Sequence, residues 1–388
     1  MPYRQLDYYR IEDLFSDEER MVRDTVREFV TENLMPIIRD CNRDARFPVE
    51  LVPKLAELGF LGAPYPEKYG CAALRPIAYG LINQELERGD SGMRSFVSVQ
   101  SGLVMFPILS YGTEAQKDYW LPRLAGGEAI GCFGLTEPDF GSNPGGMLTR
   151  AVDKGSHYVL SGNKAWITNG TIAHIAIVWA KLDGVVRGFI VETNRNGFSA
   201  PEIKNKFSLR ASVTSNLILE DVEVPKENIL PNVQGLKGPL SCLTQARYSI
   251  AWGAMGAAAA VFDEVREYSL SRIQFDKPIA SFQLVQNKLT WMATEITKGQ
   301  LLAHRLGQLK AEGKATAAQV SMAKRNNVGV ALEIARVGRD ILGANGISDE
   351  YHTFRHMNNL ESVNTYEGTY DIHTLIVGED LTGIAAYA

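Results

Sequence analysis

One carboxylate near the end of the chain stands in a segment suited to acid–base chemistry. Glu367 follows an aromatic residue, Tyr366, and precedes Gly368, so that backbone and ligand can approach it closely. A carboxylate in an apolar slot has a raised pKa and becomes a useful base near neutral pH. Removal of a proton from the carbon next to a carbonyl group requires such a base and a hydrogen-bond donor on the carbonyl oxygen. The slim Gly368 would let the N–H of Glu367 be that donor. Taken alone, the segment would more often be an ordinary surface loop.

Two segments in the middle of the chain could hold a flat ring with polar edges. The stretch 133–142 (FGLTEPDFGS) has hydroxyls at Thr136 and Ser142 and a glycine, Gly141, that removes side-chain bulk. The motif Trp166-Ile167-Thr168 adds an aromatic face and a further hydroxyl. A flavin ring needs hydrogen bonds at its edges and a partner against its face. Either motif alone is more simply a strand–turn–strand with solvated Ser and Thr.

Length and composition are those of an ordinary globular protein. The 388 residues are 45% hydrophobic and 22% charged, which suggests two or three packed units. The net charge is only −5 and the basic residues are scattered, which argues against nucleic-acid binding. Six histidines without metal-binding spacing predict no metal site. The four cysteines are far apart without CxxC spacing, which indicates free thiols: Cys41, Cys71, Cys132 and Cys242.

The start of the chain has no apolar signal core and is too acidic for a transit peptide. No apolar run reaches the length that spans a membrane, so no membrane association is expected. We expect a cytoplasmic protein, although a processed enzyme of the mitochondrial matrix would look the same.

Hydrophobic periodicity divides the chain into three regions, 1–130, 131–238 and 239–388. The first is helical and opens on a capping box at 16–19. The second has short β-branched runs without helices between them, which favours an antiparallel sheet or barrel. In the third, helical periodicity returns over lengths sufficient for a bundle. The fold class is therefore α+β, mostly α. The predicted strands cover 158–163, 175–180, 188–191 and 216–219, and the predicted C-terminal helices cover 251–269, 281–312 and 316–342.

The segment 365–369 (TYEGT), the stretch 134–142 and the motif 166–168 together resemble the acyl-CoA dehydrogenase family. The similarity extends along nearly the whole chain, and many residues look like those of its glutaryl-CoA dehydrogenases. The resemblance implies an N-terminal helical domain, a central antiparallel β-domain and a C-terminal four-helix bundle, with FAD between the last two. It also implies a homotetramer. Glu367 would then abstract the α-proton while hydride leaves the β-carbon for the flavin N5.

The resemblance also assigns FAD-binding residues. By this resemblance both central motifs would line the flavin ring, and Thr168 would lie beside N5. The C-terminal bundle holds the diphosphate and adenine, where Arg272 could form charge-assisted hydrogen bonds with phosphate. The loop at 340–346 completes the same site from a neighbouring subunit. No GxGxxG follows a strand, so a Rossmann site is unsupported. The predicted FAD-binding residues are Phe133, Leu135, Thr136, Gly141, Ser142, Trp166, Ile167, Thr168, Arg272, Phe275, Gln283, Asp340, Ile341, Leu342, Gly343, Ala344 and Thr369.

Arg94 bears on the identity of the acyl group. A pocket for a plain fatty chain should be apolar, because an unpaired buried cation is costly, whereas an acyl chain ending in a carboxylate would satisfy Arg94. This segment looks like that of the glutaryl-CoA dehydrogenases, in which the matching arginine and the following serine hold the distal carboxylate. The alternative is an exposed arginine paired with Asp90 or Glu87. Arg247 resembles a CoA-contacting position, and a surface arginine is an equal alternative. The predicted substrate-binding residues are Glu87, Arg94, Ser95, Ser98, Ser142, Thr244, Arg247, Tyr366 and Gly368.

Glu87 and Tyr366 match the family members that decarboxylate their substrate. The expected reaction is thus oxidation of glutaryl-CoA to crotonyl-CoA and CO2, with electrons passed to an electron-transfer flavoprotein. Three alternatives remain: a dehydrogenase for another short-chain or dicarboxylyl-CoA without decarboxylation, an acyl-CoA oxidase, and a non-catalytic protein that binds CoA or stores flavin.

Overall fold

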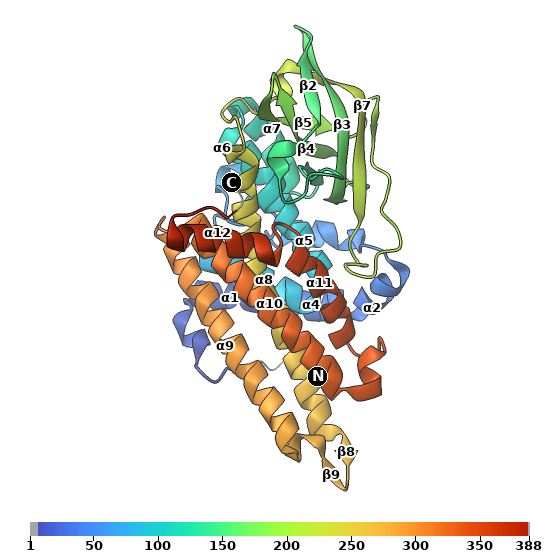
Figure 1. Ribbon diagram of the computed structural model, residues 1–388, viewed down its shortest axis with the longest axis vertical. Coiled ribbons are helices and arrows are strands. Elements are labelled where there is room, and N and C mark those ends of the chain that lie inside the picture. The colour runs from blue at the N-terminus through green and yellow to red at the C-terminus, as the bar shows by residue number, and fades with distance from the viewer. Residues whose placement is uncertain (1–6, 387–388) are drawn as a thin grey trace.

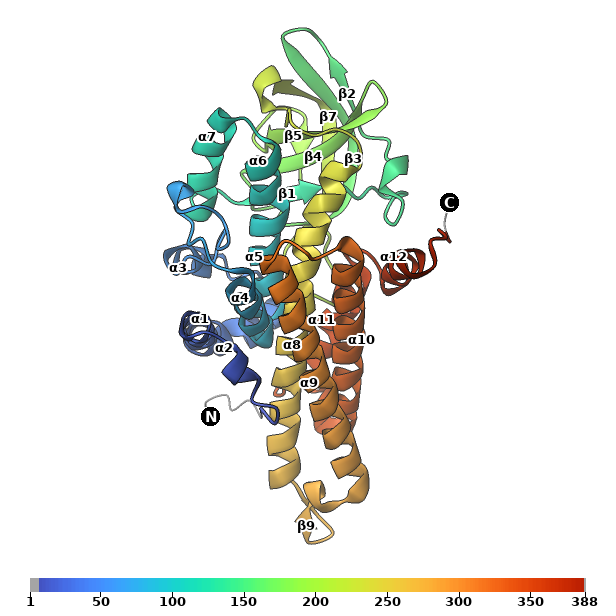
Figure 2. The same cartoon turned by 90° about the vertical axis from the view of Figure 1, so that its left-hand side faces the viewer.

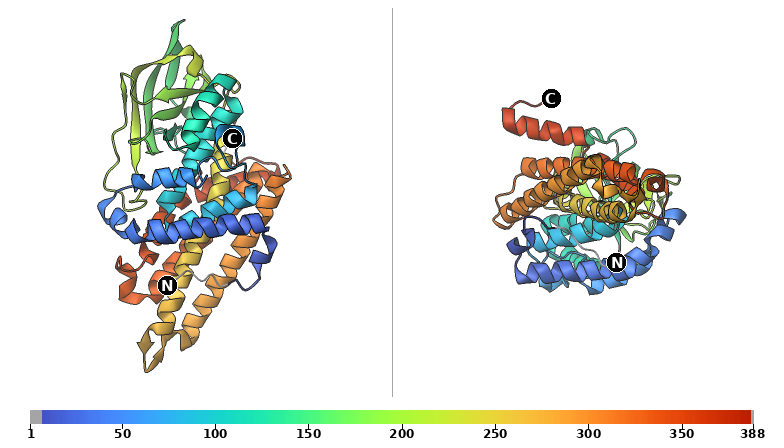
Figure 3. Two further views of the ribbon diagram at one scale, coloured as in Figure 1. Left: turned by 180° about the vertical axis from the view of Figure 1, so that it is seen from behind. Right: turned by 90° about the horizontal axis from the view of Figure 1, so that it is seen from below.

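The structure, a computed structural model, describes residues 7–386. The molecule is elongated, with a β-sheet at one end of its long axis and the tip of a helical hairpin at the other (Figures 1 and 2). The helices of the first third pack against one side of the C-terminal helices (Figure 3). The three regions predicted from periodicity are therefore helical, β and helical, in that order.

The first region begins as its sequence indicates. The hydroxyl of Ser16 accepts a hydrogen bond from the backbone N–H of Glu19 at 3.2 Å, and the carboxylate of Glu19 accepts one from the N–H of Ser16 at 2.8 Å. This capping box satisfies donors that the first turn leaves free. The helices are α1 (Asp17–Phe29), α2 (Met35–Asp44), α3 (Val52–Glu57), α4 (Pro76–Gly89), α5 (Ser91–Ser98), α6 (Phe106–Tyr111) and α7 (Glu114–Ala125), with the 3-10 turns η1 (Ile11–Leu14), η3 (Val49–Leu51) and η4 (Glu67–Tyr69).

Residues 91–111 of this helical region form one continuous helical rod. The rod consists of α5, a π-helical stretch η5 (Val99–Met105) and α6, and every residue of η5 is buried. A second π-helical stretch, η2 (Val30–Leu34), joins α1 to α2. Wider π-helical turns frequently occur at functional sites. Here η5 directly follows the helix that carries Arg94.

The second region is one curled sheet of seven strands (Figure 1). Most neighbours are antiparallel, as predicted, but β4 pairs in parallel with both β1 and β2. The chain visits β2 and β3 before it returns as β4, so these parallel contacts need no crossover helix. The strands are β1 (Gly131–Gly134), β2 (Arg150–Asp153), β3 (His157–Thr168), β4 (Ile175–Leu182), β5 (Val185–Glu192), β6 (Phe198–Ser199) and β7 (Thr214–Pro225), with the 3-10 turns η6 (Pro144–Gly146) and η7 (Lys226–Asn228).

The third region is built around α8 (Lys237–Ser271), a helix of 35 residues that begins well before the predicted residue 251. It contacts α4 of the first region as well as α9 and α10. The helix α12 crosses the end of α10 and extends outward from the bundle (Figures 2 and 3). The remaining elements are β8 (Ile273–Gln274), β9 (Lys277–Pro278), η8 (Ile279–Ser281), α9 (Gln283–Ala311), α10 (Ala317–Ile341), η9 (Gly343–Ile347), α11 (Thr353–Thr365) and α12 (Tyr370–Thr382).

Glycines allow α8 to approach α4 closely. A Cβ added to Gly256 would lie 1.8 Å from the backbone oxygen of Gln84. Because this neighbour is backbone, the two helices would have to separate. We expect Gly256→Ala to destabilise the protein by about 1–3 kcal/mol, as overpacking does. Thermal unfolding checks this against Gly378→Ala, a helical position with nothing within 4 Å, which should not lower the melting temperature.

Among residues 7–386, no helix combines the length and the apolarity that a membrane span requires.

Candidate active site

Glu367 lies in the tight loop between α11 and α12, in a backbone conformation that side chains rarely adopt. Its φ is +52° and that of Gly368 is +94°, so two consecutive residues are left-handed. A Cβ at position 368 would lie 2.9 Å from His373 Nε2 and 3.2 Å from Arg247 Nη2. Position 368 therefore requires glycine for two reasons: a side chain would have no space there, and the backbone has a positive φ. A non-glycine residue in this conformation is strained, and such strain clusters at functional sites.

Two buried cations hold this loop by its backbone. Lys324 Nζ, from α10, donates to the carbonyl oxygens of Tyr366 at 2.9 Å and Gly368 at 2.7 Å. Arg247 Nε, from α8, donates to the carbonyl oxygen between them, that of Glu367, at 2.8 Å. Three consecutive carbonyls thus face two cationic side chains.

The carboxylate of Glu367 lies in a low-dielectric environment. Burial raises its pKa above the ordinary value, while the nearby charges of Arg94, Lys324 and Arg247 oppose that shift. The atom Oε2 is buried and has no hydrogen-bond partner. The side chain is therefore a carboxylate with an uncommitted oxygen and an elevated pKa, which are the properties required of a general base.

Arg94 is fully buried at the same place, and this excludes the exposed alternative. Its Nε donates to Glu87 at 2.6 Å, and its Nη2 donates to the hydroxyl of Tyr366. A Cβ at position 253 would lie 2.0 Å from Glu87, so Gly253 of α8 makes room for this ion pair. Burial lowers the pKa of Arg94, but Glu87, Tyr366 and Glu367 together outweigh burial, and the pKa is raised overall. The guanidinium is permanently charged.

Three side-chain atoms of α5 have no partner, and one of them is Ser91 Oγ at its first residue. Arg94 Nη1 and Ser98 Oγ are buried and make no hydrogen bond within the described residues. Ser95 is buried on the same helix. Buried polar groups are normally hydrogen-bonded, so unpartnered donors beside the Glu367 loop indicate a place for a polar ligand group.

Arg247 is 7% exposed, so the surface alternative is wrong for it. Its Nε is already engaged with the Glu367 carbonyl. Thr244, one turn earlier, is half-buried and donates its hydroxyl to the carbonyl of Leu240 at 3.0 Å. Thr369 is the N-cap of α12, and its hydroxyl accepts the N–H of Ile372 at 3.1 Å.

The two central motifs come together on the sheet. The N–H of Ala165 donates to the carbonyl of Thr136 at 2.9 Å, which joins the first motif to the second. The pairing of β3 with β7 shifts between Lys164 and Ile167, and this bulge contains Trp166 with φ +61°. A β-bulge changes the direction in which a side chain points. Here the side chain of Trp166 points outward, and the residue is 64% exposed.

The remaining residues of these motifs are either buried or lie on an exposed turn. The side chains of Phe133, Leu135 and Ile167 are buried beneath the motifs. Gly141 and Ser142 lie on an exposed turn, and a Cβ at 141 would meet nothing within 4 Å. An exposed indole beside an uncovered, hydroxyl-bearing turn fits a flat aromatic cofactor such as flavin.

A buried ion pair that the sequence analysis missed supports this turn. Lys164 Nζ donates to Glu137 at 2.9 Å and to the carbonyl of Leu135 at 3.1 Å. The other bonds of the Glu137 carboxylate are to the N–H groups of Leu148 and Thr149. Burial lowers the pKa of Lys164 to about 8. The sequence signal that could have revealed this ion pair is a lysine at a position of the strand where a buried residue is expected.

The other predicted FAD-binding residues lie far from the sheet. Arg272, Phe275 and Gln283 are exposed around the tip of the α8–α9 hairpin, and 340–344 ends α10 on the same side of the bundle (Figures 1 and 2). Phe275 is 87% exposed with φ +51°. The single chain does not bring this group to Trp166, because the bundle separates them along the long axis.

Lys324 and His373 were also missed. Lys324 lies three and four residues from other buried positions of α10, so the helical spacing places it on the buried face of that helix. A lysine on the apolar face of a helix is unusual, and this sequence signal could have revealed it. His373 of α12 packs against Gly368, and burial lowers its pKa to about 3, so the imidazole is neutral.

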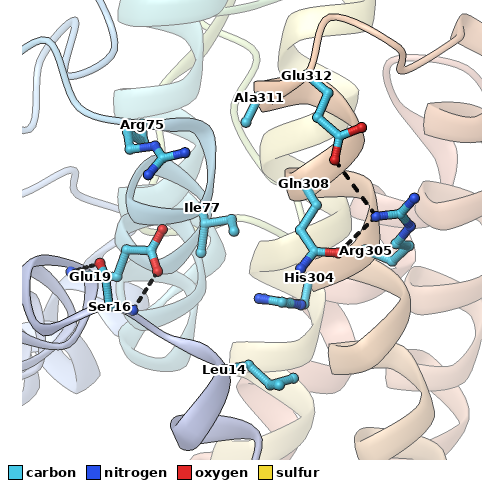
Figure 4. A pocket seen from close by; sticks show the side chains of 10 residues that line it. All are labelled: Leu14, Ser16, Glu19, Arg75, Ile77, His304, Arg305, Gln308, Ala311 and Glu312. Carbon is cyan, nitrogen blue, oxygen red and sulfur yellow. Dashed lines mark hydrogen bonds and ion pairs between the residues drawn. The ribbon is translucent and has the colours of Figure 1, made fainter.

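A separate pocket of about 350 Å³ lies between the N-terminal segment and α9 (Figure 4). Its walls include Glu19, Arg75 and His304, and none of the predicted site residues lines it. Residues 7–386 contain no group of three or more His, Cys, Asp or Glu side chains that could hold a metal ion.

Comparison with known proteins gives the family of the chain. Three family models match: the acyl-CoA dehydrogenase N-terminal domain over residues 16–128, the middle domain over 132–222 and the C-terminal domain over 233–382. The mitochondrial short-chain specific acyl-CoA dehydrogenase of Bos taurus is 34% identical over 372 residues, 94% of this chain and 90% of that protein.

Two solved structures are similar over nearly the whole chain. A glutaryl-CoA dehydrogenase from Mycobacterium smegmatis in complex with FADH2 is 50% identical, covers 100% of both chains and has a TM-score of 0.98. A glutaryl-coenzyme A dehydrogenase in complex with glutaryl-CoA is 34% identical, covers 97% of both chains and has a TM-score of 0.92. By its three matched domains and these full-length similarities, the chain belongs to the acyl-CoA dehydrogenase family and is an acyl-CoA dehydrogenase.

Proposed function

We propose that this acyl-CoA dehydrogenase oxidises glutaryl-CoA and decarboxylates the product to crotonyl-CoA and CO2, with electrons passed to an electron-transfer flavoprotein. The observation that carries the proposal is the buried guanidinium of Arg94, which is linked to the Glu367 loop through the hydroxyl of Tyr366 and has an unpartnered Nη1. A plain acyl chain would leave that donor without a partner, whereas a distal carboxylate would accept from it.

FAD is the cofactor, as predicted from the sequence. When bound, FAD accepts the hydride that leaves the β-carbon. The exposed Trp166, the open turn at Gly141 and the hydroxyl of Thr168 fit the ring. Arg272 and Phe275 are too distant in one chain to complete the same site, so we propose that a second copy supplies them. Their exposure, with that of Ile273 and Leu284, supports a homotetramer.

Glu367 acts in this proposal as the base for the α-proton. Its free Oε2 accepts the proton, and its raised pKa makes the transfer favourable near neutral pH. The peptide between Tyr366 and Glu367 is trans, and its carbonyl faces Lys324. The N–H of Glu367 therefore points away from Lys324, where it is available to donate to a thioester oxygen.

Decarboxylation would follow from the same cluster. Once the α,β double bond has formed, loss of the γ-carboxylate as CO2 leaves electrons that delocalise through the enone to the thioester. The carbon that lost CO2 then takes up the proton that Glu367 had removed from the α-carbon, which gives crotonyl-CoA and restores the carboxylate. Glu87 already pairs with Arg94 at 2.6 Å, so the guanidinium does not over-stabilise a second carboxylate. Because Arg94 is shared between Glu87 and the substrate carboxylate, we expect release of CO2 and not glutaconyl-CoA as the final product.

An anaerobic titration of the purified yellow protein with glutaryl-CoA and with butyryl-CoA tests the proposal. We expect glutaryl-CoA to bleach the flavin selectively and to yield crotonyl-CoA and CO2. Equal bleaching by butyryl-CoA would favour the short-chain alternative, which the similarity to the Bos taurus enzyme also suggests. Release of glutaconyl-CoA would contradict decarboxylation, and rapid peroxide formation in air would indicate an oxidase.

A further inference from the structure

The side chain that most directly shapes the Glu367 loop is a buried lysine outside the predicted site. Lys324 is 1% exposed, and its ammonium spans the loop from the carbonyl of residue 366 to that of residue 368. Among residues 7–386 no carboxylate oxygen lies within ion-pair distance of its ammonium, and Glu367 attracts it only from farther away. A buried cation is costly to maintain without a counter-charge, so its two short bonds to the backbone need a reason.

The backbone conformation supplies that reason. The loop turns through consecutive left-handed residues, Glu367 and Gly368, of which the first is strained. Such a turn leaves three adjacent carbonyls directed at one side of the loop. Lys324 binds the first and third and Arg247 binds the second, so neither cation alone covers the set. The opposite side of each peptide, with its N–H, faces away from the cations.

We propose that Lys324 is a positioning residue for Glu367: it holds the carbonyls of residues 366 and 368 so that the carboxylate and the N–H of Glu367 face the acyl thioester. The inference rests on the proposed role of Glu367. Without the ammonium, the loop that contains the strained residue Glu367 would lose two of the three side-chain hydrogen bonds that hold its carbonyl groups. The loop would then relax, and the base would be misplaced with respect to the α-carbon.

Lys324 also contributes charge to the site. The groups that face Glu367 are Arg94 from α5, Arg247 from α8, Lys324 from α10 and the neutral His373 from α12. Burial lowers the pKa of Lys324 itself to about 7, so the ammonium is charged on the acid side of neutrality, and there it lowers the pKa of Glu367. Removing that charge should raise this pKa further, so the acid limb of the pH–rate profile should move to higher pH.

The test is Lys324→Met in the full-length protein loaded with FAD. We expect a roughly 10- to 100-fold slower flavin reduction at saturating acyl-CoA, as for a small misplacement of reacting groups, with little change in KM. The acid limb should shift upward, a change that a purely structural role would not produce. Lys310→Met is the control, because Lys310 is a half-buried lysine that donates to Gln245 of a neighbouring helix and not to the Glu367 loop. Its rate and pH profile should remain those of the wild type.

Lys324→Gln is the second variant if the methionine variant does not bind FAD. It removes the charge and keeps a donor, so the pH limb should still move upward while more of the rate is retained. If either folded variant has the wild-type rate and pH profile, Lys324 is not a positioning residue. If the wild-type protein itself reduces its flavin with neither glutaryl-CoA nor butyryl-CoA, the proposed function fails instead, and the two failures are distinguishable.

Discussion

Glu367→Gln should slow flavin reduction by an acyl-CoA about 10²- to 10⁴-fold, the range that a general base contributes. The amide has nearly the shape of the carboxylate, so the loop, its bonds to Lys324 and Arg247 and the bound FAD should be retained. Stopped-flow absorbance of the flavin measures the rate, and the visible spectrum measures the flavin content. Near wild-type reduction in a variant that binds FAD would exclude Glu367 as the base.

The pH dependence gives an independent check on the same residue. Only the deprotonated carboxylate can accept a proton, so the rate should fall as pH falls through the pKa of Glu367. Because burial raises this pKa above 4.5, the limb should lie above that pH. Glu361→Gln is the matched control, since Glu361 lies on α11 a short distance before the loop and is exposed, in an ion pair with Arg336. Its rate and profile should be unchanged.

Arg94→Met should abolish the preference for glutaryl-CoA over butyryl-CoA. The variant keeps an unbranched side chain about as long as the aliphatic part of arginine but removes the donors to Glu87, to Tyr366 and to a distal carboxylate. Loss of a charged partner from a buried pair costs about 2–5 kcal/mol, so kcat/KM for glutaryl-CoA should fall by roughly 30-fold or more. The value for butyryl-CoA should fall less. Measurement of kcat/KM for both substrates decides the matter.

The same substitution should also lower stability, and this must be separated from selectivity. It leaves Glu87 buried and unpaired, which costs about 3–5 kcal/mol. Arg88→Met is the matched control, because Arg88 and Glu85 form another buried pair on α4, at 3.0 Å. That variant should be destabilised while the ratio of the two kcat/KM values stays that of the wild type. If Arg94→Met also leaves the ratio unchanged, Arg94 is a structural ion pair and does not select the substrate.

The order of the three regions and most of their elements could be predicted from the sequence. Local signals are sufficient where a capping box starts α1 or where β-branched runs alternate with turn residues, because these patterns depend on neighbours a few positions apart. The start of α8 was missed by fourteen positions, since its first turns pack against the sheet and do not show a simple amphipathic stripe.

The residues of the candidate site were recognisable as a set, but their surroundings were not. The sequence left Arg94 either exposed or buried, and only the approach of α4, α5 and α8 shows that its guanidinium has no access to solvent. The same holds for Arg247. Burial depends on contacts between residues distant in the chain, and no local pattern reports it.

The type and order of the chemical groups were thus determined by the sequence: one carboxylate beside a glycine, two motifs predicted to bind a flavin ring and an arginine suited to a distal acid. The tertiary structure alone decided which groups share a charge, which carbonyls Lys324 holds and how far the hairpin tip lies from the sheet. The physical reason is that hydrogen bonds and desolvation act over a few ångströms in space, whereas the partners at this site are separated by tens or hundreds of residues along the chain.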